Sequence, residues 1–106
     1  MNAPANAIQV PPHLRSTYEM IVAAFPNGVP DVMYLPLLAL LADNMSFRGV
    51  ANVMALVSGN EAPLIYHDVL VAISPNSERK PEPSCIDSVR QLLLPHGYER
   101  WAMEED

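Results

Sequence analysis

Three histidines are the first residues of this 106-residue chain to consider for chemistry: His13, His67 and His96. A zinc site needs several ligands that converge, often three or four residues apart on one helix. His67 is followed by Asp68, which lies about 100° away around a helix, and no ligand residue stands three or four positions from it. The sequence therefore predicts no metal site. It predicts an ordinary hydrogen bond at the core boundary for His67 and a polar role at a helix C-terminus for His96.

Cys85 is the only cysteine, so its thiol is the only candidate nucleophile of that kind. We place it in the first turn of the last long helix, where the helix dipole lowers a thiol pKa. Nucleophilic catalysis also needs a base and an oxyanion site, and neither a histidine nor a basic residue neighbours Cys85. The prediction is a half-buried packing cysteine.

The acidic residues give no paired constellation for acid–base catalysis. Asp43, Glu61, Asp68 and Asp87 each stand near a predicted turn or helix N-terminus, where caps and first-turn charges are the ordinary explanation. The four glycines are dispersed and form no phosphate-binding loop. We therefore predict no catalytic, cofactor-binding or metal-binding residue, no cofactor, and a protein that is not an enzyme.

An apolar stretch from residue 34 to 57 reads as two helices joined by a polar turn at 43–46. A helix-turn-helix DNA reader is one interpretation, with Phe47, Arg48, Asn52 and Ser58 on the recognition helix. A single arginine there is a poor reader of DNA, so a buried core hairpin is the preferred interpretation. Pro36 predicts a kink or a 3₁₀-like first turn, with the regular helix over 35–42.

Flanking segments complete an all-α bundle of about five helices. The first starts near Pro12 and carries an apolar stripe of Leu14, Tyr18, Ile21, Val22 and Phe25. Residues 64–74 fit a helix or a strand, and helix is preferred because no second strand exists to pair with it. Ser84 is predicted to cap the last long helix, which ends at 95–97, with Tyr98 and Trp101 folding back. We divide the chain into a disordered tail at 1–11, one domain at 12–98 and an acidic tail at 99–106.

The charge and hydrophobic content of the chain disfavour some classes of binding partner. The chain has 12 acidic against 6 basic residues, for a net charge of −6, and half its residues are hydrophobic. The dispersed basic residues disfavour nucleic acid and anionic lipid. The longest apolar run, 32–42, is far shorter than the roughly 20 residues of a membrane span. A lone cysteine and an N-terminus without a secretory pattern predict a cytoplasmic protein.

Two motifs, taken together, are similar to those of a known protein family. The segment Phe25–Pro30 (aromatic-Pro-x-Gly-Val-Pro), followed by the apolar run at 34–41, resembles domain-of-unknown-function family thirty-three forty-nine, small proteins of mycobacteria and other actinobacteria. The resemblance covers about residues 14–98. It implies five helices around one core, and it implies no activity, cofactor or site residue. Members often carry arginines after the apolar run, where this chain has Ala42, Asp43 and Asn44.

These observations predict a non-enzymatic helical module that binds another protein or itself, as a monomer or homodimer. A mean hydropathy of +0.10 is high for a small domain and favours an exposed apolar patch. The alternative is a helix-turn-helix-like regulator that binds nucleic acid. A third hypothesis is a ligand pocket inside the bundle, which would require ionisable groups converging in one cavity.

Overall fold

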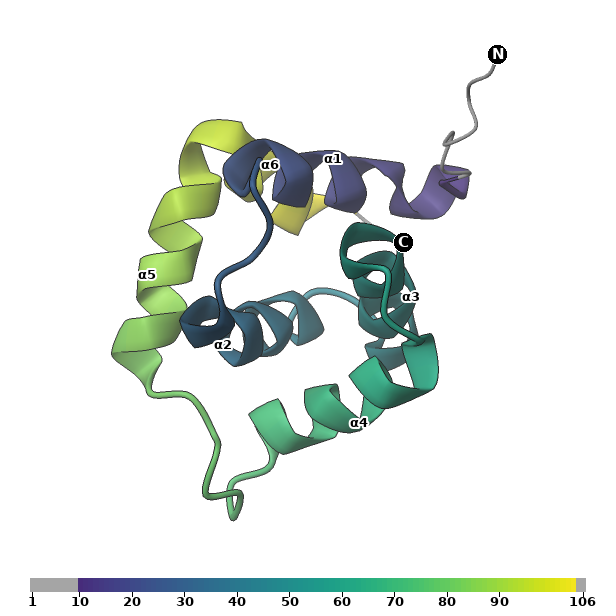
Figure 1. Ribbon diagram of the computed structural model, residues 1–106. Coiled ribbons are helices and arrows are strands. Elements are labelled where there is room, and N and C mark those ends of the chain that lie inside the picture. Colours follow the sequence, from purple (N-terminus) through teal and green to yellow (C-terminus); the bar gives the residue numbers. More distant parts are fainter. Residues whose placement is uncertain (1–9, 105–106) are drawn as a thin grey trace.

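Helix α2 (Asp31–Ala42) lies at the centre of the molecule, inside a frame made by α1, α3, α4 and α5 (Figure 1). The computed structural model describes residues 10–104. α2 packs against α3, α4 and α5. Six consecutive residues, 36–41, are buried, because α2 is apolar around its whole circumference and has neighbours on several sides.

The other elements follow in chain order. They are η2 (Pro12–Leu14), α1 (Arg15–Ala24), α3 (Phe47–Ser58), α4 (Ala62–Ile73), α5 (Pro83–Leu93), η3 (Leu94–His96) and α6 (Tyr98–Met103). The described residues contain no strand, so the predicted all-α fold is confirmed. Five of the helices have ten or more residues, and α6 is a short sixth.

The kink or 3₁₀-like turn predicted at Pro36 is wrong, because the helix is regular there and the 3₁₀-type bond lies earlier in the chain. α2 is already regular from Asp31, four residues before the predicted start, and Pro36 lies inside it. Proline lacks an N–H, so it removes one hydrogen bond, but its place in the second turn and its burial keep the helix continuous. A 3₁₀-type bond does occur at the entry, where the Met33 N–H donates to the carbonyl of Pro30.

Helix α3 has the predicted ends. The Ser46 hydroxyl accepts a hydrogen bond from the Gly49 N–H at 3.0 Å, which caps the N-terminus. Gly59 closes the C-terminus with a φ of 82°, a left-handed conformation that favours glycine. A Cβ at Gly49 would lie 2.9 Å from the terminal methyl group of Met45, so a larger residue here would require that flexible side chain to shift.

Helix α1 is rotated relative to the predicted stripe. Thr17 and Met20 are buried with Leu14 and Ile21, whereas Val22 is exposed. A buried threonine hydroxyl needs a hydrogen-bond partner. Trp101 supplies that partner, since its indole N–H donates to the Thr17 hydroxyl at 2.7 Å.

The C-terminal segment packs against the domain beyond residue 98. α6 contacts α1, and Trp101 is buried with its ring 5.8 Å from that of Tyr98, which confirms the predicted fold-back. Helical structure thus reaches Met103, inside the segment 99–106 that we predicted as an acidic tail. Residues 1–9 of the predicted N-terminal tail and residues 105–106 lie outside the described residues.

No helix within residues 10–104 has the length and hydropathy to span a lipid bilayer.

Candidate functional site

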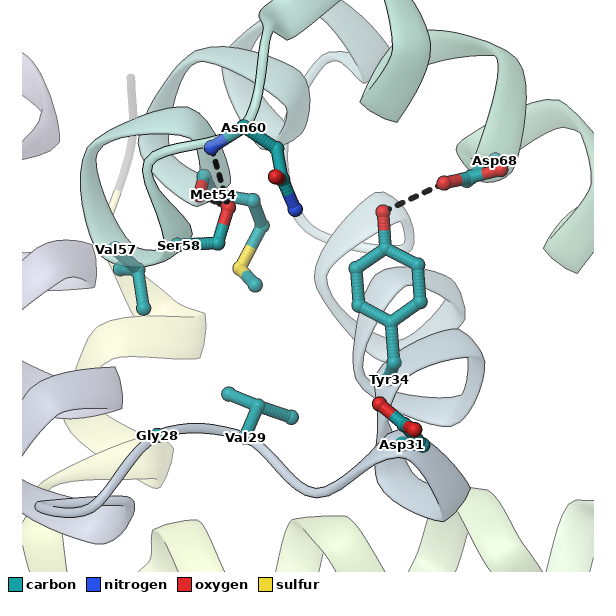
Figure 2. Close-up of a pocket in the computed structure, with 9 residues that line it drawn as sticks. All are labelled: Gly28, Val29, Asp31, Tyr34, Met54, Val57, Ser58, Asn60 and Asp68. Atoms are coloured by element: carbon teal, nitrogen blue, oxygen red, sulfur yellow. Dashed lines mark hydrogen bonds between the residues drawn. The ribbon is translucent and has the colours of Figure 1, made fainter.

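A pocket opens where the start of α2, the end of α3 and the middle of α4 meet (Figure 2). Its volume is about 410 Å³, within the usual range for small-ligand sites. We call it the Tyr34 pocket, and its lining consists of Gly28, Val29, Asp31, Tyr34, Met54, Val57, Ser58, Asn60 and Asp68. The pocket combines an apolar wall with several polar groups.

Tyr34 and Asp68 form the polar side of this pocket. The Tyr34 hydroxyl, on α2, donates a 2.8 Å hydrogen bond to Oδ2 of Asp68, on α4. The two residues are 34 positions apart, and the packing of α2 against α4 brings them together. Because the tyrosine proton is committed to Asp68, the lone pairs of the phenol oxygen are free to accept.

Burial is the main cause that raises the pKa of Tyr34 well above its ordinary value. The hydrogen bond to Asp68 and the negative charge of Asp68 raise this pKa further, while the positive charge of Arg79 acts in the opposite direction. Tyr34 is therefore a neutral phenol at physiological pH and cannot act there as a base.

The opposite side of the pocket is the C-terminal end of α3. The Ser58 hydroxyl donates to the Met54 carbonyl at 2.8 Å and accepts from the Asn60 N–H at 3.2 Å. Figure 2 shows the Asn60 side chain extending toward the side that holds Tyr34 and Asp68, with Val29 below the open space. These local hydrogen bonds fix the wall that faces Asp68.

A second surface feature is the outer face of α4, which we define as Pro63, Leu64, Tyr66, His67 and Leu70. All five side chains are exposed, and only His67 and the Tyr66 hydroxyl make this face polar. Beside it runs a shallow groove of about 520 Å³ between α3 and α4, lined by Arg48, Ala51, Asn52, Ala62, Pro63 and Tyr66. α4 therefore carries apolar residues on its exposed side as well as its buried side.

The structure places the histidines and the cysteine apart from one another. His67 is exposed on α4 and makes no side-chain hydrogen bond within the described residues, so the predicted boundary position is wrong. His96 ends η3 as predicted. Cys85 does lie in the first turn of α5, but it is exposed and not half-buried. Residues 10–104 contain no cluster of three or more ligand side chains that could hold a metal ion.

Glu61 and Asp43 stand at a helix N-terminus and a turn, as predicted, whereas Asp68 and Asp87 lie within helices. Asp68 lies in the middle of α4, where it partners Tyr34. Glu61 occupies the N-cap position of α4 without a side-chain hydrogen bond. Asp87 lies in α5 and pairs with Arg90. Asp43 is an exposed residue at the C-terminal end of α2.

The predicted cap at Ser84 is also wrong. α5 begins at Pro83, two residues before the predicted start, so Glu82 holds the N-cap position and Ser84 lies inside the first turn. Proline is favoured at the first helical position, and this preference decides the start of the helix.

Helices α2 and α3 form the predicted buried hairpin. Val50, Ala51, Val53 and Met54 of α3 are buried, which leaves Arg48 and Asn52 as the exposed pair on that helix nearest α4. Two of the four candidate DNA-reading residues, Arg48 and Asn52, thus border the shallow groove, whereas Ser58 lines the Tyr34 pocket.

Sequence reasoning missed Tyr34 and missed the role of Asp68. One signal was available: Asp68 is the only formally charged residue within α4, and Tyr34 is the only aromatic residue within α2. An isolated charge in an apolar helix requires a polar partner. That argument would have directed attention to Asp68, although the identity of its partner depends on how the helices pack.

Comparison with family models found one that matches residues 12–102, described as "Protein of unknown function (DUF3349)". The chain belongs to this family. The match confirms the family to which the sequence motifs pointed, and it covers η2 to α6. Comparisons with the curated proteins and with the solved structures found no match. The family description assigns no activity, so a function for this DUF3349 protein has to be argued from its surface and its pocket.

Proposed function

We propose that this DUF3349 protein is a non-enzymatic helical module that binds another protein through the outer face of α4. The observation that supports this proposal is the exposure of large apolar side chains on successive turns of one helix. Leu64 is 64% exposed, Leu70 is 42% exposed and Tyr66 is 38% exposed. Single exposed apolar residues are ordinary, but a contiguous set on one helix is typical of an interaction surface.

The surroundings of this face fit the anatomy of a protein interface. Leu64, Tyr66 and Leu70 make this face largely apolar, His67 lies among them, and Arg48 and Asn52 line the adjoining groove. Interfaces of transient complexes commonly have an apolar centre with tyrosine and a polar rim. A partner helix laid along the groove between α3 and α4 would bury the exposed side of α4.

The charge of the chain favours a different protein over a second copy. Each copy carries a net charge of −6, so two copies repel one another over long range at low ionic strength. A partner with basic residues would be attracted instead. Self-association as a homodimer is therefore the less favoured form of the same proposal.

The compartment and source that we propose rest on the sequence. A lone cysteine allows no intramolecular disulfide, which suits a reducing cytoplasm. The motif resemblance points to an actinobacterial protein.

Site-specific photocrosslinking tests the proposal. A photoreactive phenylalanine replaces Leu70 on α4 or Leu92 on α5, two leucines of nearly equal exposure at 42% and 41%. The full chain is expressed in an actinobacterial host and irradiated. We expect a discrete adduct from position 70 that is absent from position 92, and we expect Leu64→Glu to remove it.

The mass of the adduct separates the possible occupants. An adduct with a different protein supports the proposal, and one of twice the chain mass supports the homodimer. A crosslink to nucleic acid would favour the helix-turn-helix alternative, since Arg48 and Asn52 border the same groove. Indistinguishable patterns from positions 70 and 92 would overturn the interaction role of α4.

A further inference from the structure

The Tyr34 pocket has the dimensions of a site for a single extended side chain. Its volume is about 410 Å³, and Val29, Met54 and Val57 give it an apolar wall. Polar groups stand across from that wall, as Figure 2 shows for Tyr34 and Asp68. An occupant that suits both sides has an apolar stem and a polar end.

The polar groups of the pocket are mainly hydrogen-bond acceptors. The Tyr34 hydroxyl uses its only proton on Asp68, so its oxygen presents lone pairs to the pocket. A carboxylate offers about four acceptor positions, and the described contacts of Asp68 use one of them. Asp31, in the first turn of α2, adds a second carboxylate to the lining. A donor-rich end group therefore fits this site.

The negative charge of the pocket is not balanced by an ion pair. No basic side chain lines the cavity. Within residues 10–104 the only ion pair joins Arg90 to Asp87, on α5. The positive charge of Arg79 acts to lower the pKa of Tyr34, but Arg79 does not line the pocket. A partly buried carboxylate without a cationic partner favours a cation from outside the chain.

The pocket and the outer face of α4 adjoin one another. Leu64 precedes Asp68 by four residues, so both side chains lie on the same side of α4. A partner that covers Leu64 is thereby brought to the edge of the Tyr34 pocket. Lysine and arginine carry the required apolar stem and donor-rich cationic end.

We propose that the Tyr34 pocket binds a lysine or arginine side chain of the partner protein, with the cationic end held by Asp68 and the Tyr34 hydroxyl. This inference rests on the proposed function, because it specifies the chemistry of the partner that covers α4. The stem lies along Val29 and Val57, and the ammonium or guanidinium group donates hydrogen bonds to the Asp68 carboxylate and the phenol oxygen, while Asp31 adds negative charge at the other end of the Tyr34 ring.

Blocked amino acids serve as probes for this site in the full-length protein. N-acetyl-arginine amide is compared with N-acetyl-citrulline amide, and N-acetyl-lysine amide with N-acetyl-norleucine amide, at constant ionic strength. Amide chemical shifts of ¹⁵N-labelled protein are followed for Gly28, Val29 and Asn60. We expect saturable shifts at these residues with at least one cationic probe, and binding roughly tenfold weaker or more for its neutral counterpart.

Two charge-matched variants locate the binding. Asp68→Asn is expected to weaken the cationic probe about tenfold or more, whereas Asp43→Asn, at the far end of α2, leaves its affinity unchanged. Tyr34→Phe is expected to weaken it by a smaller factor, and it provides a second test if Asp68→Asn fails to fold.

Each remaining outcome overturns the proposal. These outcomes are the absence of saturable shifts, equal binding of cationic and neutral probes, or unchanged binding in both Asp68→Asn and Tyr34→Phe. Putrescine binding without any response to the blocked amino acids would assign the pocket to a free diamine instead. The probe titration does not involve Leu70, so failure of the pocket is distinguishable from failure of the crosslinking experiment.

Discussion

Tyr34 and Asp68 are the residues whose chemistry depends most on tertiary structure. Each lies in an otherwise apolar helix, and their hydrogen bond connects α2 to α4. A partly buried hydrogen bond of this kind contributes about 0.5–1.5 kcal/mol to stability, and more is lost if one partner remains unsatisfied. The same pair therefore stabilises the contact between the helices and forms the polar side of the pocket.

The raised pKa of Tyr34 predicts a loss of stability at alkaline pH. In the unfolded chain Tyr34 ionises near pH 10, whereas the folded protein retains the proton to higher pH, mainly because of burial. Above about pH 10 the folded state thus binds more protons than the unfolded state, and the free energy of unfolding falls as pH rises. The full stabilisation is present below that pH.

Guanidinium unfolding of the wild type and of Tyr34→Phe, from about pH 8 to pH 11, measures this contribution. We expect the variant to be less stable by about 0.5–1.5 kcal/mol at about pH 8. The difference should shrink above about pH 10, because phenylalanine cannot ionise. A difference that stays constant or grows over this range would contradict the assignment of the raised pKa to Tyr34.

The helix ends show where sequence rules succeed and where they compete. Ser46 and Gly59 follow the rules for an N-cap and a C-terminal glycine, and both were predicted correctly. At α5 two rules gave different starts, because Ser84 suits a cap and Pro83 suits the first helical position. In the structure α5 begins at Pro83, as the rule for proline predicts.

These two serines provide a matched comparison. Ser46→Ala removes the acceptor for the Gly49 N–H and should cost about 0.5–2 kcal/mol. Ser84→Ala should change stability by less than about 0.5 kcal/mol, since its side chain caps nothing and lies on the exposed surface. Urea unfolding monitored by circular dichroism gives both values. A larger loss of stability for Ser84→Ala than for Ser46→Ala would contradict this assignment and support the predicted N-cap at Ser84.

The helical state of the segments and the contribution of 34–57 to the core were predictable, because periodicity and apolar content are local signals. The rotation of α1 and the pairing of Tyr34 with Asp68 were not. The buried Thr17 hydroxyl is satisfied by Trp101, 84 positions away, whose indole N–H donates a hydrogen bond to it. Contacts between residues so distant in the chain depend on how the helices pack, which a local pattern does not encode.

At the scale of the whole molecule, the described helices share one hydrophobic core. Residues from η2, α1, α2, α3, α4, α5 and α6 contribute to it, from Leu14 to Trp101. Since α2 packs against α3, α4 and α5, a defect in α2 should be felt throughout the chain. The C-terminal α6 belongs to the same unit, because Trp101 is buried and hydrogen-bonded to α1.

Leu38→Ala tests this unity, because Leu38 is fully buried in α2 and Trp101 is the only tryptophan. The substitution should cost about 2–5 kcal/mol, a large share of the stability of a small domain. Tryptophan fluorescence reports on α6, and far-ultraviolet circular dichroism reports on all helices. We expect both transitions to shift together to lower denaturant concentration, as a single cooperative unit requires.

Val32→Ala, on the same helix at 79% exposure, is the control and should leave both transitions nearly unchanged. Separation of the two transitions in Leu38→Ala would instead show that α6 unfolds independently of the α2 core.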